Sequence, residues 1–203
     1  MVKREERDSS KKLLKEIWYI GLDQALSNTG IALFNGKTIL TTVLKTSSSR
    51  SPEERLSAID NYIDSLLKNL EPYIVLIEES YPGAHRTSAM RLAQVYCTVT
   101  NACIRNNIRY KVYRSGKGKE SWPGRLGIEG TKEHCREWLK RYKGEEEVKQ
   151  LKEHEIDAIG ILWANIIEVQ EYILDKIPIT PIKADDISKY YRETVRESPA
   201  TRK

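Results

Sequence analysis

The chain has 203 residues, 31% of them charged, and a formal net charge of +5. This length favours one domain with a core of two or three layers, and no apolar run reaches the roughly 18 residues of a membrane-spanning helix. The composition therefore argues against a membrane protein, and the charge-dense first residues lack the apolar stretch of a secretory signal. We expect a soluble, cytoplasmic protein whose cysteines, odd in number, are reduced thiols: Cys97, Cys103 and Cys135.

Positive charge is concentrated between residues 105 and 143, where twelve lysine and arginine residues stand against four glutamates. The remainder of the chain is net negative, because this segment alone exceeds the charge of the whole. One interpretation of such a run is a solvated surface. The other is a phosphate-binding face, since nucleic acid is the polyanion that a local basic patch most commonly binds.

Three strands joined by short turns are predicted first, at residues 17–24, 29–35 and 38–45. The sequence "NGK" between the second and the third is a strong hairpin signal. A capping box of Ser51 and Glu54, with Pro52 at the first helical position, then begins an amphipathic helix. The next strand, "YIVLIEES", is almost continuously apolar, as expected for a central strand covered on both faces.

The remaining chain continues the alternation of strands and helices. The predicted elements are a helix at 87–106, a short strand at 109–114, a Gly-rich basic loop at 115–130, a helix at 131–142 and a long helix at 153–175. This order predicts an α/β layered domain with a five-stranded mixed central sheet flanked by helices.

Both ends resemble appendages to a central domain at residues 17–175. Residues 1–16 are dense in charge, whereas residues 176–203 begin with two prolines close together and end polar and basic. We expect each end to be disordered or docked on a partner.

Several side chains are candidates for chemistry. Asp23 lies within a strand, where a buried carboxylate is costly unless it binds a metal or joins a hydrogen-bond network. Glu78 and Glu79 stand where the central strand ends, and only one of them faces each side of the sheet. His154 and Asp157 are three residues apart at the start of the last helix, so they share one face. Carboxylate and nitrogen donors of this kind suit Mg²⁺ or Mn²⁺.

Taken singly, these residues also have purely structural interpretations. Asp23 would cap the turn that follows it, Glu79 would be a surface charge, and His154 would bond to its own backbone. Taken together they favour chemistry, because an Asp in the first strand, a Glu ending the fourth and an HxxD pair on the last helix are the arrangement of the RNase H-like nucleases.

The first motif resembles that of the RuvC family of Holliday junction resolvases. "GLDQALSNTG" is similar to the family's GxD motif, small-residue turn and second glycine, at Gly21, Asp23 and Gly30. The chain departs from the family at Gln24, where proline is frequent.

The later motifs follow in the family's order, so that the resemblance runs from about residue 18 to about residue 166. Ile77-Glu78 is similar to the strand end that carries the family's Glu, which favours Glu78 over Glu79 as a ligand. The helix "TSAMRLAQVYCTVTNAC" looks like the family's dimer helix. His154, followed by Asp157-Ala158, matches the last motif.

The resemblance implies an RNase H-like fold and a crossover junction endodeoxyribonuclease. Such an enzyme nicks a four-way DNA junction symmetrically, leaves 5′ phosphate and 3′ hydroxyl ends, acts as a homodimer and uses two Mg²⁺ or Mn²⁺ ions per active site. The implied metal ligands and catalytic carboxylates are Asp23, Glu78, His154 and Asp157. The family's active-site lysines correspond to Lys132 and to either Lys117 or Lys119.

The DNA contacts are expected from one aromatic residue and the nearby basic residues. Tyr81 stands where the family has an aromatic wedge, and it either stacks on an unpaired base or anchors its loop by packing. Phosphate contacts are expected from Arg86, Arg91, Lys117, Lys119 and Lys132.

Other classes share part of the pattern. An actin-like or sugar-kinase-like ATPase also begins with a strand, an Asp and a Gly-containing turn, but it needs a second such domain, which 203 residues do not offer. Another RNase H-like nuclease acting on branched DNA or RNA/DNA hybrids, or a non-catalytic junction-binding protein, remains an alternative. The sequence leaves open the cleavage sequence, any branch-migration partner, and whether the protein acts at a cellular nucleoid or in the cytoplasm of a virus's host.

Overall fold

The computed structural model describes residues 17–79, 86–114, 118–128, 133–169 and 174–187. Its strands are β1 (Tyr19–Asp23), β2 (Asn28–Phe34), β3 (Ile39–Lys45), β4 (Ile74–Glu78), β5 (Tyr110–Tyr113) and β6 (Ile179–Pro181). Its helices are α1 (Pro52–Leu70), α2 (Arg86–Arg105), α3 (Trp122–Arg125), α4 (Glu133–Lys143), α5 (Glu145–Lys149) and α6 (Glu153–Val169), with 3-10 turns at Leu174–Lys176 and Ala184–Asp186. None of the helices within these ranges is long and apolar enough to cross a membrane.

The strands form one mixed sheet in the order β5-β4-β1-β2-β3-β6. The first three strands are an antiparallel meander, whereas β4 is parallel to β1 and β5 is parallel to β4. The carboxyl ends of β1 and β4 therefore lie side by side at the same end of the sheet, which is the edge formed by strand ends and not an edge strand. This mixed, helix-flanked architecture confirms the predicted fold class.

The predicted number of five strands is wrong, because β6 is a sixth. It pairs in parallel with β3, and Ile39 lies opposite Ile179. A three-residue strand that follows Pro178 and ends at Pro181 gives almost no periodic signal, and proline is tolerated at a sheet edge because one side of an edge strand needs no ladder donors. Ile179 and Ile187 are buried in the core, so packing continues beyond residue 175, where the tail was predicted to begin. The rest of that tail, from residue 188, lies outside the described residues, as does the N-terminal extension.

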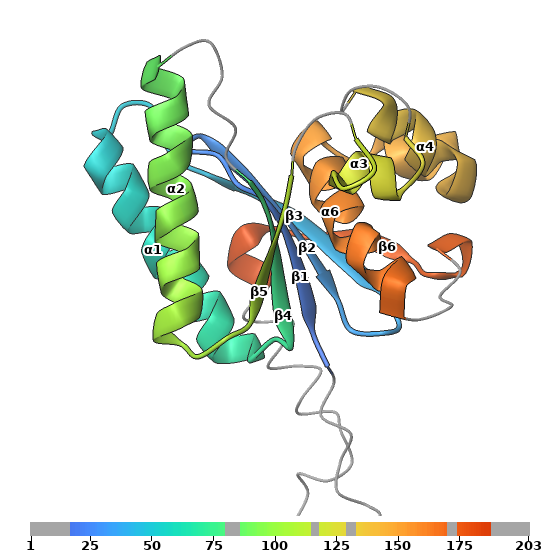
Figure 1. Cartoon of the computed structure of the whole chain (residues 1–203), viewed down its shortest axis with the longest axis horizontal. Coiled ribbons are helices and arrows are strands. Elements are labelled where there is room, and N and C mark those ends of the chain that lie inside the picture. Colours follow the sequence, from blue (N-terminus) through green and yellow to red (C-terminus); the bar gives the residue numbers. More distant parts are fainter. Residues whose placement is uncertain (1–16, 80–85, 115–117, 129–132, 170–173, 188–203) are drawn as a thin grey trace, which may run out of the picture.

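Helices cover both faces of the sheet. Figure 1 shows α1 and α2 on one face and α3, α4 and α6 on the other. Alternate side chains of the strands point into two separate hydrophobic clusters, one beneath each helical layer. The Ser51 and Glu54 capping box predicted for α1 is present, with the Ser51 N–H donating to Glu54 Oε2 over 2.8 Å and the Glu54 N–H donating to Ser51 Oγ over 3.2 Å.

Two helical segments differ from the sequence prediction. The last long helix is described as far as Val169, and Leu174–Lys176, where it was predicted to end, is a 3-10 turn. The Gly-rich basic loop contains the short helix α3, which begins because the Ser121 side chain accepts from the Gly124 N–H and Pro123 fits the first turn. The buried Trp122 opens this helix and anchors it in the core.

Two glycines allow α6 to pack directly on the sheet. A Cβ atom at Gly21 would clash with the main-chain oxygen of Ala158, and one at Gly30 would clash with that of His154. The GxD motif and the second glycine therefore have a steric purpose, since they let the first turns of α6 approach β1 and β2.

Candidate active site

Asp23 and Glu78 are neighbours at the ends of parallel strands. Leu22 pairs with Ile77, so the residues that follow them lie next to each other at the same edge of the sheet. Two residues before them, Gly21 and Leu76 face α6, and alternation along a strand directs Asp23 and Glu78 to that same face. Both carboxylates are buried, with 6% and 8% of their surface exposed respectively.

The first turn of α6 supplies the other two predicted ligands. His154 Nδ1 lies 2.7 Å from Asp23 Oδ2, so the helix start is bonded to the end of β1. The Asp23 hydrogen bond raises the pKa of His154, helped by the charges of Asp23, Asp157 and Glu153 against a lowering effect of partial burial. Asp157 is buried, with 4% of its surface exposed.

Glu78 is held by groups on two sides. Its Oε1 accepts a hydrogen bond from Trp122 Nε1 over 2.9 Å, and its main-chain oxygen accepts one from Gln24 Nε2. Glu79, by contrast, is exposed and its Oε2 lies 3.9 Å from Arg114 Nε. The sheet thus directs Glu78 towards α6 and leaves Glu79 at the surface, the orientation in which Glu78 shares a face with Asp23.

The donor types suit a divalent metal. Three buried carboxylates and one imidazole come from the ends of β1 and β4 and from the first turns of α6, and Mg²⁺ and Mn²⁺ favour such oxygen-rich sets. Within the described ranges, however, no three His, Cys, Asp or Glu side chains are gathered in the arrangement of a complete metal site. His154 is turned to Asp23 and Glu78 to Trp122. The residues therefore fit a metal by donor type, and Asp23 and Glu78 lie on neighbouring strand ends.

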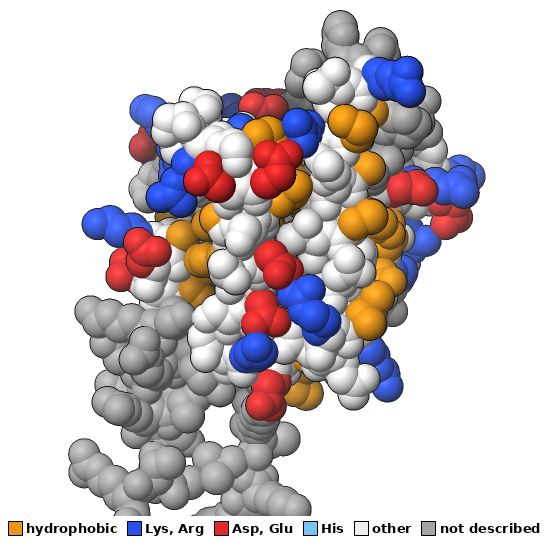
Figure 2. Space-filling view, turned by 90° about the vertical axis from the view of Figure 1, so that its left-hand side faces the viewer, with side chains coloured by type: hydrophobic (Ala, Val, Ile, Leu, Met, Phe, Trp, Pro, Cys, Tyr) orange, Lys and Arg blue, Asp and Glu red, His pale blue; other side chains and the backbone are white. Residues whose placement is uncertain are grey.

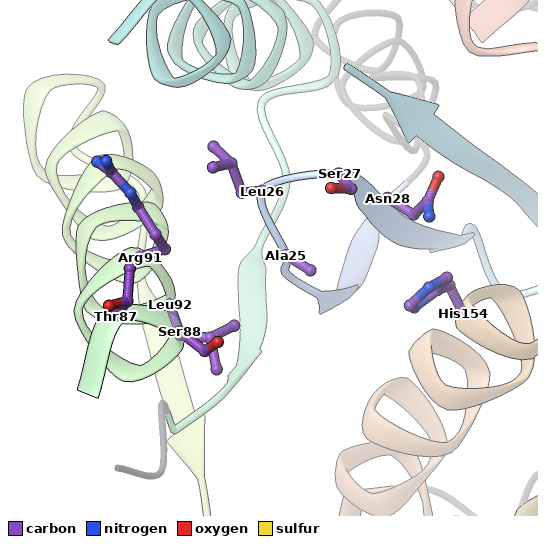
Figure 3. A pocket seen from close by; sticks show the side chains of 9 residues that line it. All are labelled: Ala25, Leu26, Ser27, Asn28, Thr87, Ser88, Arg91, Leu92 and His154. Atoms are coloured by element: carbon purple, nitrogen blue, oxygen red, sulfur yellow. The ribbon is translucent and has the colours of Figure 1, made fainter. Parts of the chain in front are cut away.

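A pocket opens beside His154 (Figure 3). Its volume is about 390 Å³, and it lies between the β1–β2 turn, the first half of α2 and the start of α6. Its lining residues are Ala25, Leu26, Ser27, Asn28, Thr87, Ser88, Arg91, Leu92 and His154. Arg91 stands across the pocket from His154 in Figure 3, and its Nη1 donates to Gln94 Oε1 over 2.9 Å. A cation thus lies on the α2 wall of the pocket, opposite His154.

The predicted DNA-contacting residues are only partly described. Arg86 is exposed at the start of α2, and Lys119 is exposed just before α3. Tyr81, Lys117 and Lys132 lie outside the described residues, so their predicted roles stay predictions.

Part of the charge in the basic segment is engaged within the chain. Arg105 bonds to Asp60, and Arg136 donates to the main-chain oxygens of Val148 and Leu151. Lys140 Nζ lies 3.0 Å from Glu137 Oε1. These three cations stabilise helix contacts, so they are poor candidates for a continuous phosphate-binding face.

Sequence reasoning missed the partners of Glu78. Trp122 was hidden in a segment predicted to be a loop, and Gln24 was noted only as a departure from proline. A tryptophan in a basic, Gly-rich segment is the one local signal, because so large an apolar side chain is seldom left in a solvated loop.

Comparisons with known proteins agree on one family. The model of the family described as "Crossover junction endodeoxyribonuclease RuvC" matches residues 19–134, more than half of the chain. A crossover junction endodeoxyribonuclease RuvC from Rickettsia akari (strain Hartford) is 22% identical over 110 residues, which are 52% of this chain and 70% of the relative.

Two solved structures share the fold. The chain resembles T. thermophilus RuvC in complex with a Holliday junction substrate, with a TM-score of 0.60, 19% identity and coverage of 74% of this chain and 92% of that one. The Thermus thermophilus RuvC structure gives a TM-score of 0.58, 18% identity and coverage of 74% and 93%. The matched family segment includes Asp23 and Glu78 and ends before α6.

Proposed function

The chain belongs to the crossover junction endodeoxyribonuclease RuvC family, and from this membership we propose that it is a Holliday junction resolvase that cuts four-way DNA junctions by metal-dependent hydrolysis. One observation in the chain itself carries the proposal furthest. Asp23 lies beside Glu78 across the β1–β4 pair and within 2.7 Å of His154 on α6, so the family's first motif and the last predicted motif meet at one edge of the sheet.

Asp23, Glu78, Asp157 and His154 would hold Mg²⁺ or Mn²⁺. When bound, such ions would activate a water for attack on the phosphorus and stabilise the leaving 3′ oxygen. Burial of the three carboxylates keeps competing water away from their oxygens, and their origin on strand ends and a packed helix fixes their directions. The products expected are a 5′ phosphate and a 3′ hydroxyl.

His154 links two elements of the site. Its Nδ1 faces Asp23, which orients the ring and leaves the opposite side of the imidazole directed away from that carboxylate. His154 also lies on the wall of the cavity that Arg91 lines. A phosphate entering that cavity would meet the positive charge of Arg91 next to the candidate catalytic edge.

A homodimer formed through α2 would match the two-fold symmetry of a four-way junction, with one site for each of two opposed strands. Met90 and Ile104 on α2 are exposed at 54% and 62%, although both are apolar. Ala93 and Cys97, which lie between them at helical spacing, are exposed as well. Figure 2 shows hydrophobic side chains in a broken stripe along one side of the face formed by α1 and α2, next to a group of paired charges.

A cleavage panel tests the proposed activity. The purified protein is incubated with Mg²⁺ or Mn²⁺ and with a four-way junction, a flap, an RNA/DNA hybrid and a linear duplex of matched sequence. We expect paired nicks in the junction and little cutting of the linear duplex. Preferential cutting of the hybrid or the flap would replace the proposed substrate by that of another RNase H-like nuclease, and binding without cutting in either metal would leave a junction-binding protein.

A further inference from the structure

Trp122 lies at the centre of the contact between Glu78 and helix α6. Its side chain is fully buried, and its Nε1–H donates to Glu78 Oε1 over 2.9 Å. An indole N–H donates but does not accept, so the carboxylate oxygen is necessarily the acceptor. The N-cap at Ser121 fixes the position of Trp122 at the start of α3, which means that the donor is held by a backbone element.

The other side of the Trp122 ring rests on α6 itself. A Cβ atom at Gly160 would clash with Cζ3 of the Trp122 ring and would lie 3.0 Å from its Cε3. Gly160 is three residues beyond Asp157 on the same helix, so Trp122 contacts both Glu78 at the end of β4 and the helix that carries Asp157. The size and position of Trp122 therefore set the approach of two predicted metal-binding elements.

Gln24 complements this arrangement through the main chain. Its side-chain Nε2 donates to the main-chain oxygen of Glu78, and it stands directly after Asp23, the last residue of β1. Gln24 is itself buried at 6% exposure. The main-chain oxygen and the carboxylate of Glu78 thus each accept a hydrogen bond, from Gln24 and from Trp122 respectively.

We propose that Trp122 is a positioning residue that orients the Glu78 carboxylate for divalent metal binding and fixes its separation from Asp157 on α6. The proposal rests on the metal-dependent function proposed above. Hydrogen-bond partners of ligating carboxylates hold those ligands in their binding orientation, and removing such a partner typically weakens metal affinity by about 10- to 100-fold. Trp122 acts through Glu78 and touches no reacting atom.

The test measures Mn²⁺ binding to the full chain without DNA, by titration calorimetry. Trp122→Phe keeps an aromatic ring and removes the N–H donor, and we expect it to weaken Mn²⁺ affinity by at least about tenfold. Trp138→Phe is the matched control, because Trp138 lies on α4 and is buried in the same core cluster. We expect this variant to bind Mn²⁺ with an affinity within about twofold of wild type, a smaller change than the loss of a ligand's hydrogen-bond partner causes. Equal affinities of wild type and Trp122→Phe would overturn the proposal.

A spectroscopic measurement on the unmodified protein covers the case in which Trp122→Phe does not fold. The indole N–H resonance of Trp122 is identified by elimination, using Phe variants of the other three tryptophans, Trp18, Trp138 and Trp163. We expect the chemical shift of this resonance to change when Mg²⁺ is added, because the ion would alter the environment of Glu78, which accepts the indole hydrogen bond. An unchanged chemical shift while Mg²⁺ binds would overturn the proposal. If wild type binds neither metal, the proposed function itself fails; if it binds and Trp122 is indifferent, only this inference fails.

Discussion

His154 Nδ1 lies 2.7 Å from Asp23 Oδ2, although the two residues are 131 positions apart in the chain. The contact joins the end of the central strand β1 to the first turn of α6. Because Gly30 has no Cβ, the main chain of His154 approaches the sheet closely enough to make this contact. The geometry of the candidate site therefore depends on small residues beside it as much as on the ligands.

The Asp23–His154 contact makes metal-free stability depend on pH. The pKa of His154 is raised in the folded state above its unfolded value of about 6.5. Its contribution to the free energy of unfolding is fully present below about pH 6.5 and is lost as pH rises through the higher folded value. Urea unfolding with a chelator present, at several pH values, should show the difference between wild type and His154→Gln shrinking over that window. His134→Gln, at an exposed histidine on α4, is the control and should follow the wild-type profile.

Removing the charge of Asp23 should abolish cutting and preserve junction binding. Asp23→Asn keeps the shape of the side chain but removes a predicted metal ligand. The cleavage rate should therefore fall by more than the roughly 100-fold that follows loss of a residue hydrogen-bonded to a metal ligand. Junction affinity is measured separately in a chelator by gel shift. Glu79→Gln changes an exposed carboxylate one residue from Glu78 and should cut normally. A parallel loss of junction binding in Asp23→Asn would assign Asp23 a structural role instead.

Adding a methyl group at Gly30 or Gly21 should destabilise the fold and misplace α6. Gly30→Ala forces a Cβ atom against the main chain of His154, and Gly21→Ala forces one against Ala158. Overpacking of this kind typically costs about 1–3 kcal/mol of unfolding free energy, measured by denaturant titration. Lys45→Ala, at an exposed position of β3, should change stability by less than about 0.5 kcal/mol. Wild-type stability in both glycine variants would contradict the close approach of α6.

A negative charge introduced among the exposed apolar residues of α2 should dissociate the proposed dimer. Burial of Met90 or Ile104 in the dimer interface would contribute about 1.5–3 kcal/mol each to the free energy of association. Met90→Glu or Ile104→Glu replaces that apolar side chain with a carboxylate, so the dimer dissociation constant should rise at least tenfold. Sedimentation velocity measures this dissociation constant. Tyr142→Glu, at an exposed apolar residue on α4, is the control. If wild type sediments as a monomer at micromolar concentration, the dimer proposal fails.

Junction affinity should depend on salt, and the basic residues on α2 should contribute to that dependence. Removing one side chain that binds a phosphate reduces the slope of log affinity against log salt by about 1. We expect Arg86→Ala and Arg91→Ala each to lower the slope, measured by fluorescence anisotropy between low and physiological salt. Arg105→Ala, whose guanidinium bonds to Asp60, is the matched control on the same helix. An unchanged slope in Arg86→Ala and Arg91→Ala would show that these side chains do not contact phosphates.

The fold class and the location of the candidate site could be predicted because their signals are local. The hairpin, the capping box and the GxD strand are each encoded within a few residues, and His154 and Asp157 share a helical turn. What could not be predicted depends on distant partners. Trp122 becomes a donor to Glu78 only after α3 packs beneath the sheet, and no local pattern connects residues 44 positions apart.

β6 escaped prediction for a related reason. Its three residues, the last of them Pro181, carry too little periodicity to be recognised, and their strand conformation depends on pairing with β3.

The pairing of β3 with β6 also has a consequence for how the protein is made. The outer edge of β3 is complete by residue 45, but its partner strand is not synthesised until residues 179–181. During translation this edge therefore carries unpaired main-chain donors and acceptors for most of the polypeptide's length, a state that invites pairing with other nascent chains. The first half of the outer edge of β3, at Ile39–Thr41, therefore gains its ladder partner only after most of the chain has been made.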